Sequence, residues 1–444
     1  MGASTWTCVR VLAAFGGIVM TVAASSEAKA QLIERYFPSD LPGYGPDTTG
    51  SVVMRQMIEN SQPGIPVHDF IIRPKVSQSV GYNANVLATP GTGSAQLDTS
   101  ASLRVNSDWR RNAAGVSVGV ANKAYPSLSQ AGYTNWNVGA GGALDIGRDR
   151  VSLGYSHSAQ HLSATDLGNF GVAYPVPYAV DDLRIGYTKT WGRFSLIPGA
   201  AWDDYSFGSA TGPVAYDSRD FHSVSHQTES QMLQSRFAIS QGDAVVAILR
   251  ASEAQFVKGG GTSSNYIDGG GFVGVDLRSD AVLQYRALVG GETRHFTNAS
   301  TRAIVTPTAE VDVIWTPGRR NTITLTGWRG IFDPTSPFSR NQTASSIRLQ
   351  FDRELHHDLY LRGFASAAKT VSRSSDVDGP DRRQTQFTFG VGVNWKINRD
   401  FTASLNYSHM NSYSHYGVAQ TTSYGVSRST YAANAVILSL SFAR

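Results

Sequence analysis

The amino-acid sequence predicts an all-β fold, a transmembrane up-and-down antiparallel β-barrel of about 18 strands. Apolar residues recur at every second position from residue 71 onward, which is typical of strands with one apolar face. Short and long polar connections alternate between these strands. The composition agrees, because only 16% of the residues are Asp, Glu, Lys or Arg and 44 of 444 are Gly, which is unusual for a soluble enzyme.

Residues 1–30 are expected to form a secretory signal peptide. Arg10 supplies the basic flank, Val11 to Ala24 form the apolar stretch, and Ala28-Lys29-Ala30 is a small-residue cleavage site. The one cysteine, Cys8, lies inside this segment, so the mature chain is expected to carry none. Disulfides, thiolate nucleophiles and cysteine-ligated metals are therefore excluded from the predicted chemistry.

Residues 31–70 form a separate region without alternation. Five prolines interrupt it, and Val52 to Glu59 is the one stretch that could form a short helix. Two interpretations remain open. The region is either a periplasmic N-terminal extension or a plug that folds into the barrel and narrows its lumen.

Residues 71–444 are predicted to form the barrel itself. The positions between the apolar residues carry Gly, Ser, Thr, Asn and scattered charge. A strand that crosses an outer membrane needs about 9 to 11 residues, apolar toward lipid and polar toward the lumen. Clear apolar faces are Val116, Val118, Val120; Leu183, Ile185, Tyr187; Ile347, Leu349, Phe351; Phe387, Phe389, Val391; and Val436, Leu438, Leu440.

The connections fix the expected topology. Nine long polar segments alternate with eight short turns, joining eighteen strands. A period near forty residues also occurs in propellers, but a blade holds four short strands, whereas each period here holds two long ones. The short turns lie 37 to 50 residues apart, at Arg110-Arg111-Asn112, Gly147-Arg148-Asp149, Gly192, Gln241-Gly242-Asp243, Arg278-Ser279-Asp280, Pro317-Gly318-Arg319, His356-His357-Asp358 and Asn398-Arg399-Asp400.

Tryptophan placement supports a membrane setting. Four residues lie beside short turns, whereas Trp136, Trp202 and Trp328 lie nearer the long segments. Aromatic rings at both membrane interfaces form girdles in outer-membrane barrels. The predicted girdle at the short-turn end consists of Trp109, Trp191, Trp315 and Trp395.

Alternation also predicts which charges face the lumen. Eight Arg and five acids are expected there. Either they pair and brace the wall, or they line a mildly cationic pore that favours anionic solutes and binds carboxylates bidentately. The predicted lumen residues are Arg104, Asp182, Arg184, Arg236, Arg250, Asp276, Arg286, Glu292, Arg294, Asp312, Arg348, Asp352 and Arg362.

Few residues indicate reaction chemistry. Ser408 and Ser412 lie beside His409 and His415, which would suit an outer-membrane acyl hydrolase, but no orienting acid accompanies them. No catalytic residue, cofactor or metal is expected. Basic and acidic residues are interspersed at a formal charge of +4, so no nucleic-acid partner is expected either.

The entry to the predicted barrel carries a family resemblance. Gly64 to Phe70, Arg73 to Val76 and Gly81 to Val86 resemble the opening of the outer-membrane β-barrel porin family often encoded beside exopolysaccharide or capsule genes. His68 and Asn83 depart from its more typical Gly and Asp. The final strand, Asn434 to Ala443, resembles a barrel-insertion signal but ends Phe-Ala-Arg rather than on an aromatic residue. The family implies an outer-membrane barrel and a connection with polysaccharide.

Three functional hypotheses follow from these observations, and the two that we favour, the first and the second, are not enzymatic. The first is a porin-like channel in the outer membrane for passive passage of small solutes or saccharides, linked to exopolysaccharide export. The second is a structural or adhesive barrel with a plugged lumen, and the third is a hydrolase. Expected partners are outer-membrane lipid, the barrel-assembly machinery, and polysaccharide or small solutes.

Overall fold

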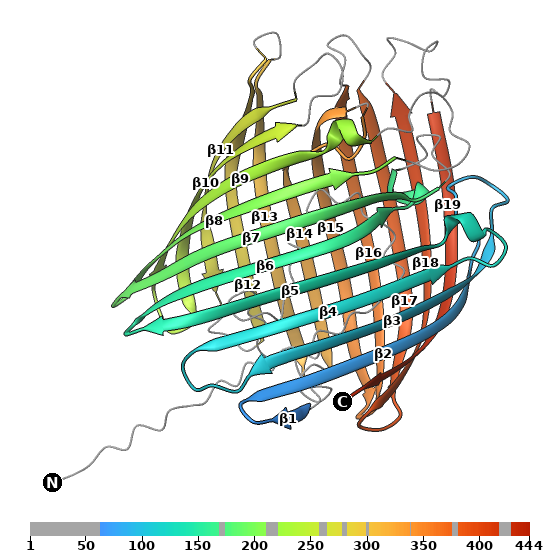
Figure 1. Ribbon diagram of the computed structural model, residues 1–444, viewed down its shortest axis with the longest axis horizontal. Coiled ribbons are helices and arrows are strands. Elements are labelled where there is room, and N and C mark those ends of the chain that lie inside the picture. The colour runs from blue at the N-terminus through green and yellow to red at the C-terminus, as the bar shows by residue number, and fades with distance from the viewer. Residues whose placement is uncertain are drawn as a thin grey trace.

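The computed structural model contains one closed antiparallel sheet (Figure 1). It describes residues 63–167, 174–209, 221–256, 264–277, 282–298, 302–337, 339–374, 381–416 and 428–444. The predicted signal peptide and most of the region 31–70 lie outside these residues.

The strands are mostly 12 to 18 residues long. This exceeds the roughly 9 to 11 residues that a tilted strand needs to cross a bilayer, so the strands also extend beyond it. They are β1 (Ile65–Val67), β2 (Phe70–Asn83), β3 (Ser94–Ser107), β4 (Ala113–Ala124), β5 (Tyr133–Ile146), β6 (Asp149–Leu162), β7 (Val176–Trp191), β8 (Phe194–Phe207), β9 (His226–Ala238), β10 (Asp243–Phe256), β11 (Tyr266–Leu277), β12 (Leu283–Phe296), β13 (Ile304–Gly318), β14 (Asn321–Phe332), β15 (Ser339–His356), β16 (Leu359–Ser374), β17 (Arg382–Lys396), β18 (Phe401–Tyr416) and β19 (Arg428–Ala443).

The barrel closes between its first and last long strands. Each strand from β2 to β19 pairs antiparallel with the next, and β19 returns to β2, from Ala435 opposite Asn83 to Ala443 opposite Lys75. The eighteen-stranded up-and-down barrel predicted from the sequence is thus confirmed. The short strand β1 adds a hairpin to β2 at its periplasmic end, with Val67 opposite Phe70.

Short and long connections lie at opposite ends of the barrel, as the sequence predicts. The predicted short turn at Arg278-Ser279-Asp280 lies outside the described residues. Gly147, Gly192 and Gly242 adopt positive φ at short turns, a conformation that lacks steric cost only for glycine. The described helices all belong to the long connections: η1 (Ser129–Ala131), α3 (Ala164–Leu167) and η2 (His222–Val224). No helix among the described residues is long and apolar enough to cross a membrane.

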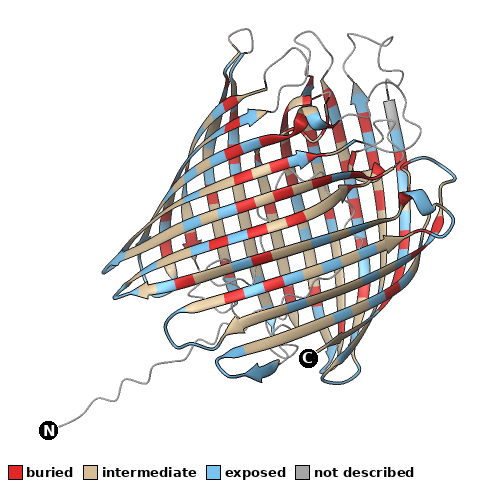
Figure 2. Cartoon of the chain, viewed as in Figure 1, coloured by how far each residue is buried: buried red, intermediate tan, exposed pale blue. Residues whose placement is uncertain are grey.

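The outward face is apolar. Buried and exposed residues alternate along the strands (Figure 2), and large apolar side chains occupy the exposed positions. Leu183 and Ile185, for example, are 43% and 52% exposed, whereas Asp182 between them is 1% exposed. An apolar surface of this kind is unfavourable in water and favourable in lipid.

The long connections fold partly back into the barrel. One apolar cluster joins Leu167 of α3 to Tyr178 of β7, Phe207 of β8 and Val224 of η2. Another joins Ala88, between β2 and β3, to Met410 of β18 and Tyr431 of β19. Apolar packing therefore lies inside the outer end of the barrel, where an open pore would carry only solvated side chains.

Candidate functional site

The lumen wall is the candidate site, and its charges come from alternate positions of the strands. Asp182 and Arg184 lie between outward Leu183 and Ile185 on β7, and the same alternation places the other predicted lumen residues away from the exposed apolar face. Which of these residues contact a solute stays a prediction.

Most of the lumen arginines lie beside an acid. Arg184 and Asp182 are joined by a forked contact whose Nη2 to Oδ2 distance is 2.7 Å. The remaining wall pairs are Arg236 with Asp276 (3.3 Å), Arg286 with Glu310 (3.6 Å) and Arg362 with Asp352 (2.5 Å). Asp312 lies directly opposite Arg286 in the strand register. Charge pairing of this kind braces the wall and reduces the net positive field.

Two arginines lie over aromatic rings. The guanidinium of Arg250 lies 4.9 Å from the ring centroid of Phe272, and that of Arg348 lies 4.2 Å from the ring centroid of Phe364. Arg250 is exposed to the lumen. A cation over a ring leaves part of the guanidinium fork accessible to a bound anion.

Basic residues gather at the periplasmic end of β2 and β3. Arg104 lies directly opposite Arg73, and Lys75 follows on the same inward face of β2. Arg104 is among the lumen residues predicted from the sequence, whereas Arg73 and Lys75 are not, although their spacing from outward Val76 assigns both to the lumen.

Arg294 is the centre of a buried network at the outer end. It is 2% exposed and contacts Asp268 of β11 at 2.7 Å and Asp333, beyond β14, at 3.0 Å. It also donates to Asn341 at 3.1 Å. Tyr266 stacks on the guanidinium and donates to Asp333 at 2.5 Å. Burial alone would raise the pKa of Asp333, but the nearby Arg294 and His226 hold that pKa well below its usual range.

The start of the connection between β6 and β7, residues 163–167, reaches into the barrel and contacts a distant part of the wall. The carbonyl of Leu167 accepts a hydrogen bond from Arg382 of β17 at 3.1 Å, and the carbonyl of Thr165 accepts one from the hydroxyl of Tyr431 of β19 at 3.1 Å. Six strands separate β6 from β17 around the wall. These contacts therefore reach across the lumen and do not join neighbouring strands of the wall. The outer mouth is narrowed by this segment.

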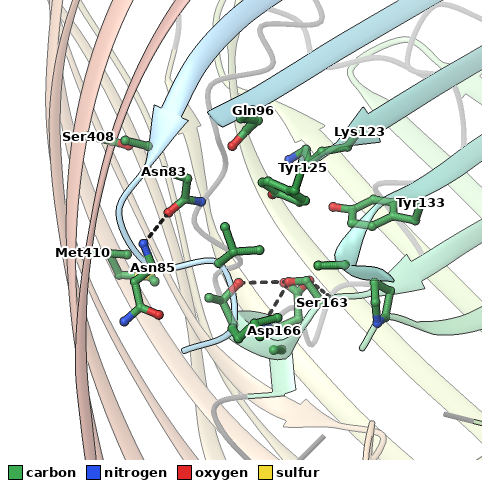
Figure 3. Close-up of a pocket in the computed structure, with 18 residues that line it drawn as sticks. Asn83, Asn85, Gln96, Lys123, Tyr125, Tyr133, Ser163, Asp166, Ser408 and Met410 are labelled. Atoms are coloured by element: carbon green, nitrogen blue, oxygen red, sulfur yellow. Dashed lines mark hydrogen bonds between the residues drawn. The ribbon is translucent and has the colours of Figure 1, made fainter. Parts of the chain in front are cut away.

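A polar cavity of about 90 Å³ lies between this segment and the wall. Figure 3 shows its labelled side chains converging from both sides of the barrel closure. Asp166 accepts a hydrogen bond from the Ser163 hydroxyl (2.6 Å), which holds the turn of α3. The wall opposite presents Asn83, Gln96, Lys123, Tyr125 and Tyr133.

A larger cavity of about 530 Å³ lies on the other side of the lumen, lined by Arg184, Arg250, Phe272, Glu292, Glu310 and Trp328 among others.

Several acids of the lumen were missed by sequence reasoning. Glu310, Asp268 and Asp203 all face inward, and Asp203 lies directly opposite Asp182. Glu310 and Asp268 follow the same alternation as their neighbours, so the pattern could have found them. Asp203 was ambiguous because Asp203 and Asp204 are adjacent, which places one acid on each face of the strand. The excess of Arg over acids is therefore smaller than eight against five.

The tryptophans divide into two groups. Trp109, Trp191, Trp315 and Trp395 are 44–50% exposed at the short-turn end, where a girdle is predicted. Trp328 differs from the expectation that it belongs to an outer girdle: it lies opposite Glu310 and Ser346, and it lines the lumen. Its neighbours on β14 are small or polar, so the sequence pattern around it was weak.

The hydrolase hypothesis fails on geometry. Ser408 and Ser412 belong to the inward face of β18, whereas His409 and His415 belong to the outward face. The wall separates each histidine from each serine, so neither can act as its base. Among the described residues, His356, His357 and Asp358 bring three metal-ligand atoms within 4.8 Å, in an exposed periplasmic turn.

An eighteen-stranded antiparallel barrel with an apolar exterior and a polar interior defines an outer-membrane β-barrel protein. Residues 61–434 match the family described as "Putative beta-barrel porin 2", and the chain belongs to that family. The protein is therefore an outer-membrane porin-family barrel, which confirms the predicted location. No curated protein matches the sequence.

Solved outer-membrane barrels resemble the chain in fold. The siderophore receptor PirA from Acinetobacter baumannii has a TM-score of 0.46 at 8% identity, covering 86% of this chain and 81% of that chain. The FrpB iron transporter from Neisseria meningitidis has a TM-score of 0.46 at 8% identity, covering 84% of this chain and 81% of that chain.

Proposed function

We propose that the barrel is a passive channel for small solutes or saccharides, narrowed at its outer mouth by the segment between β6 and β7. The polar, charged inward face is the observation that carries the proposal. A barrel with a purely structural role does not need a continuous series of Arg, Asp and Glu along its interior, because well-packed apolar residues usually stabilise an interior at least as well as buried ion pairs.

The chemistry of the larger lumen cavity favours saccharides among the candidate solutes. Charged groups that bind hydroxyls or carboxylates, such as Arg250 and Glu292, alternate with the rings of Phe272 and Trp328. Ligand sites commonly combine an apolar lining with a few convergent polar groups. Acidic sugars would add forked contacts to arginine.

A link to exopolysaccharide export is part of the same proposal. A channel with sugar-binding walls would let a polymer or its fragments pass without a specific pocket for each unit. Deleting the gene should then reduce extracellular polysaccharide without changing its intracellular synthesis. Unchanged secretion in the deletion strain would remove this link and leave the channel proposal intact.

A structural barrel with a closed lumen is the second candidate. The contacts of Thr165 and Leu167 with the opposite wall favour it, because they reduce the open cross-section. Swelling of liposomes that contain the refolded protein separates the two candidates. Entry of mono- and disaccharides supports the channel, whereas liposomes as tight as protein-free ones support the closed barrel.

A further inference from the structure

A basic cluster lies on the outward face of three adjacent strands. Lys369 and Arg373 of β16, Arg383 of β17 and His415 of β18 are all exposed. In the strand register, Arg383 lies directly opposite His415 on one side and Val371 on the other. It is therefore a diagonal neighbour of both Lys369 and Arg373, at a spacing of about 7–8 Å.

Among the described residues, most of this charge has no acidic partner. Arg373 pairs with Asp381 at 2.6 Å. Within the part of the chain that the structure describes, the cations Lys369 and Arg383 form no ion pair. Like charges placed side by side repel one another unless an anion lies between them.

The cluster lies at the depth of the outer headgroups. Trp395 and Leu359 lie opposite each other beside the short turn, at the periplasmic boundary. Lys369 is ten residues further along β16, which at 3.3 Å per residue and a 40° tilt is about 25 Å, the height of the apolar band of such barrels. Phe387 and Phe389, exposed by 48% and 49%, lie directly below the charges on β17.

Charges of opposite sign lie at a similar depth across the barrel. Asp181, Asp204, Glu229 and Glu253 occupy outward positions on the four adjacent strands β7 to β10, with Asp181 opposite Asp204 and Glu229 opposite Glu253. If the outward charges at this end of the barrel served only solubility, positive and negative side chains would be mixed around the circumference. The basic cluster is therefore a local feature of β16 to β18.

We propose that this cluster binds the phosphate groups of an anionic lipid in the outer leaflet, with the lipid's acyl chains on Phe387 and Phe389. An amphiphile fits both parts of the surface, because its anionic head meets the cations while its chains cover the apolar strip beneath. A soluble anion would contact only the basic cluster and leave the apolar strip uncovered. The inference is independent of whether the lumen conducts.

The test is a binding titration of the refolded full-length chain in uncharged detergent. Diphosphoryl lipid A, monophosphoryl lipid A and phosphatidylcholine are the probes, and microscale thermophoresis is the readout. We expect the affinity to fall in that order and to weaken in concentrated salt, because screening shortens the range of the attraction. The triple variant Lys369→Gln, Arg373→Gln, Arg383→Gln should bind diphosphoryl lipid A about tenfold or more weakly.

A matched variant controls for net charge. Arg319→Gln, Arg353→Gln and Arg399→Gln remove three exposed arginines near the periplasmic turns and should leave the affinity unchanged. If the triple variant does not fold, Lys369→Gln alone should still show a smaller loss. Equal binding by the parent and the triple variant would overturn the proposal. Complete displacement of lipid A by excess inorganic phosphate would also overturn it, since the site would then recognise a free anion.

Discussion

Arg382 of β17 donates a hydrogen bond to the main-chain carbonyl of Leu167, which lies 215 residues earlier in the chain and on a distant part of the wall. Arg382 is buried and also donates to Ser414 of β18 at 2.9 Å, so its position is fixed from the wall side. A main-chain acceptor held by a fixed guanidinium cannot move freely. The end of α3 is therefore tethered across the lumen.

The strand register can be tested by adjacent substitutions. Leu349 is 49% exposed on the lipid face of β15, whereas Gln350 faces inward and donates to Asp352 at 2.7 Å. Leu349→Arg should lower the free energy of unfolding in lipid by roughly 2 to 4 kcal/mol, because a charge would enter hydrocarbon. Gln350→Arg should cost much less. Equal losses in urea titrations of the two variants would mean that the faces are wrongly assigned.

Much of the barrel is predictable because lipid imposes a strict rule on sequence. Each crossing must show apolar residues at every second position, and each return needs a turn, so Gly147, Gly192 and Gly242 mark strand ends directly. The count of eighteen strands follows from eight short turns and nine long connections in alternation. Charges such as Arg184 and Arg348 are assigned to the lumen by the same rule.

The outer mouth was not predictable in this way. Contacts such as Arg382 with Leu167, or Arg294 with Asp333, join residues far apart in the chain and outside the alternating pattern. Each of these contacts depends on where a long connection turns inward. Neither periodicity nor composition encodes that direction, so the narrowing segment and the buried network appear only in three dimensions.

Ion selectivity should depend on the lumen arginines. Replacing Arg286, Arg348 and Arg362 with Gln removes three positive charges and should shift the reversal potential in a salt gradient toward cations. The shift should shrink in concentrated salt, because the Debye length falls from about 10 Å at 0.1 M to about 3 Å at 1 M. Arg353→Gln, which removes an exposed charge from the outward face of β15, should have no effect. A reversal potential that is the same in parent and triple variant would assign these arginines to wall bracing alone.

The network around Arg294 should stabilise the outer end in a pH-dependent way. Asp333→Asn removes the carboxylate from a buried pair and should cost roughly 3 to 5 kcal/mol at neutral pH. Because the pKa of Asp333 is lowered in the folded protein, its contribution is complete above the usual value of 3.8 and is lost only as the pH falls through the lowered value.

The measurement is urea unfolding of parent and Asp333→Asn at several pH values. The gap between the two curves should stay constant down to about pH 4 and narrow below it. Asp358→Asn is the control, because Asp358 lies in an exposed turn and its pKa is lowered mainly by a hydrogen bond from His356. A gap that closes between pH 7 and pH 5 would show that a group other than Asp333 controls this stability.

The most direct test of the account is the conductance of single barrels in planar bilayers, for the parent and for Tyr431→Phe. The variant removes the hydroxyl that donates to Thr165 and leaves the ring in place, whereas Tyr413→Phe, on the outward face of β18, removes a hydroxyl without touching the segment. We predict discrete conductance steps for the parent, larger steps for Tyr431→Phe, and parental steps for Tyr413→Phe. The absence of conductance in all three folded proteins would contradict the claim that the barrel is a channel narrowed by the segment between β6 and β7.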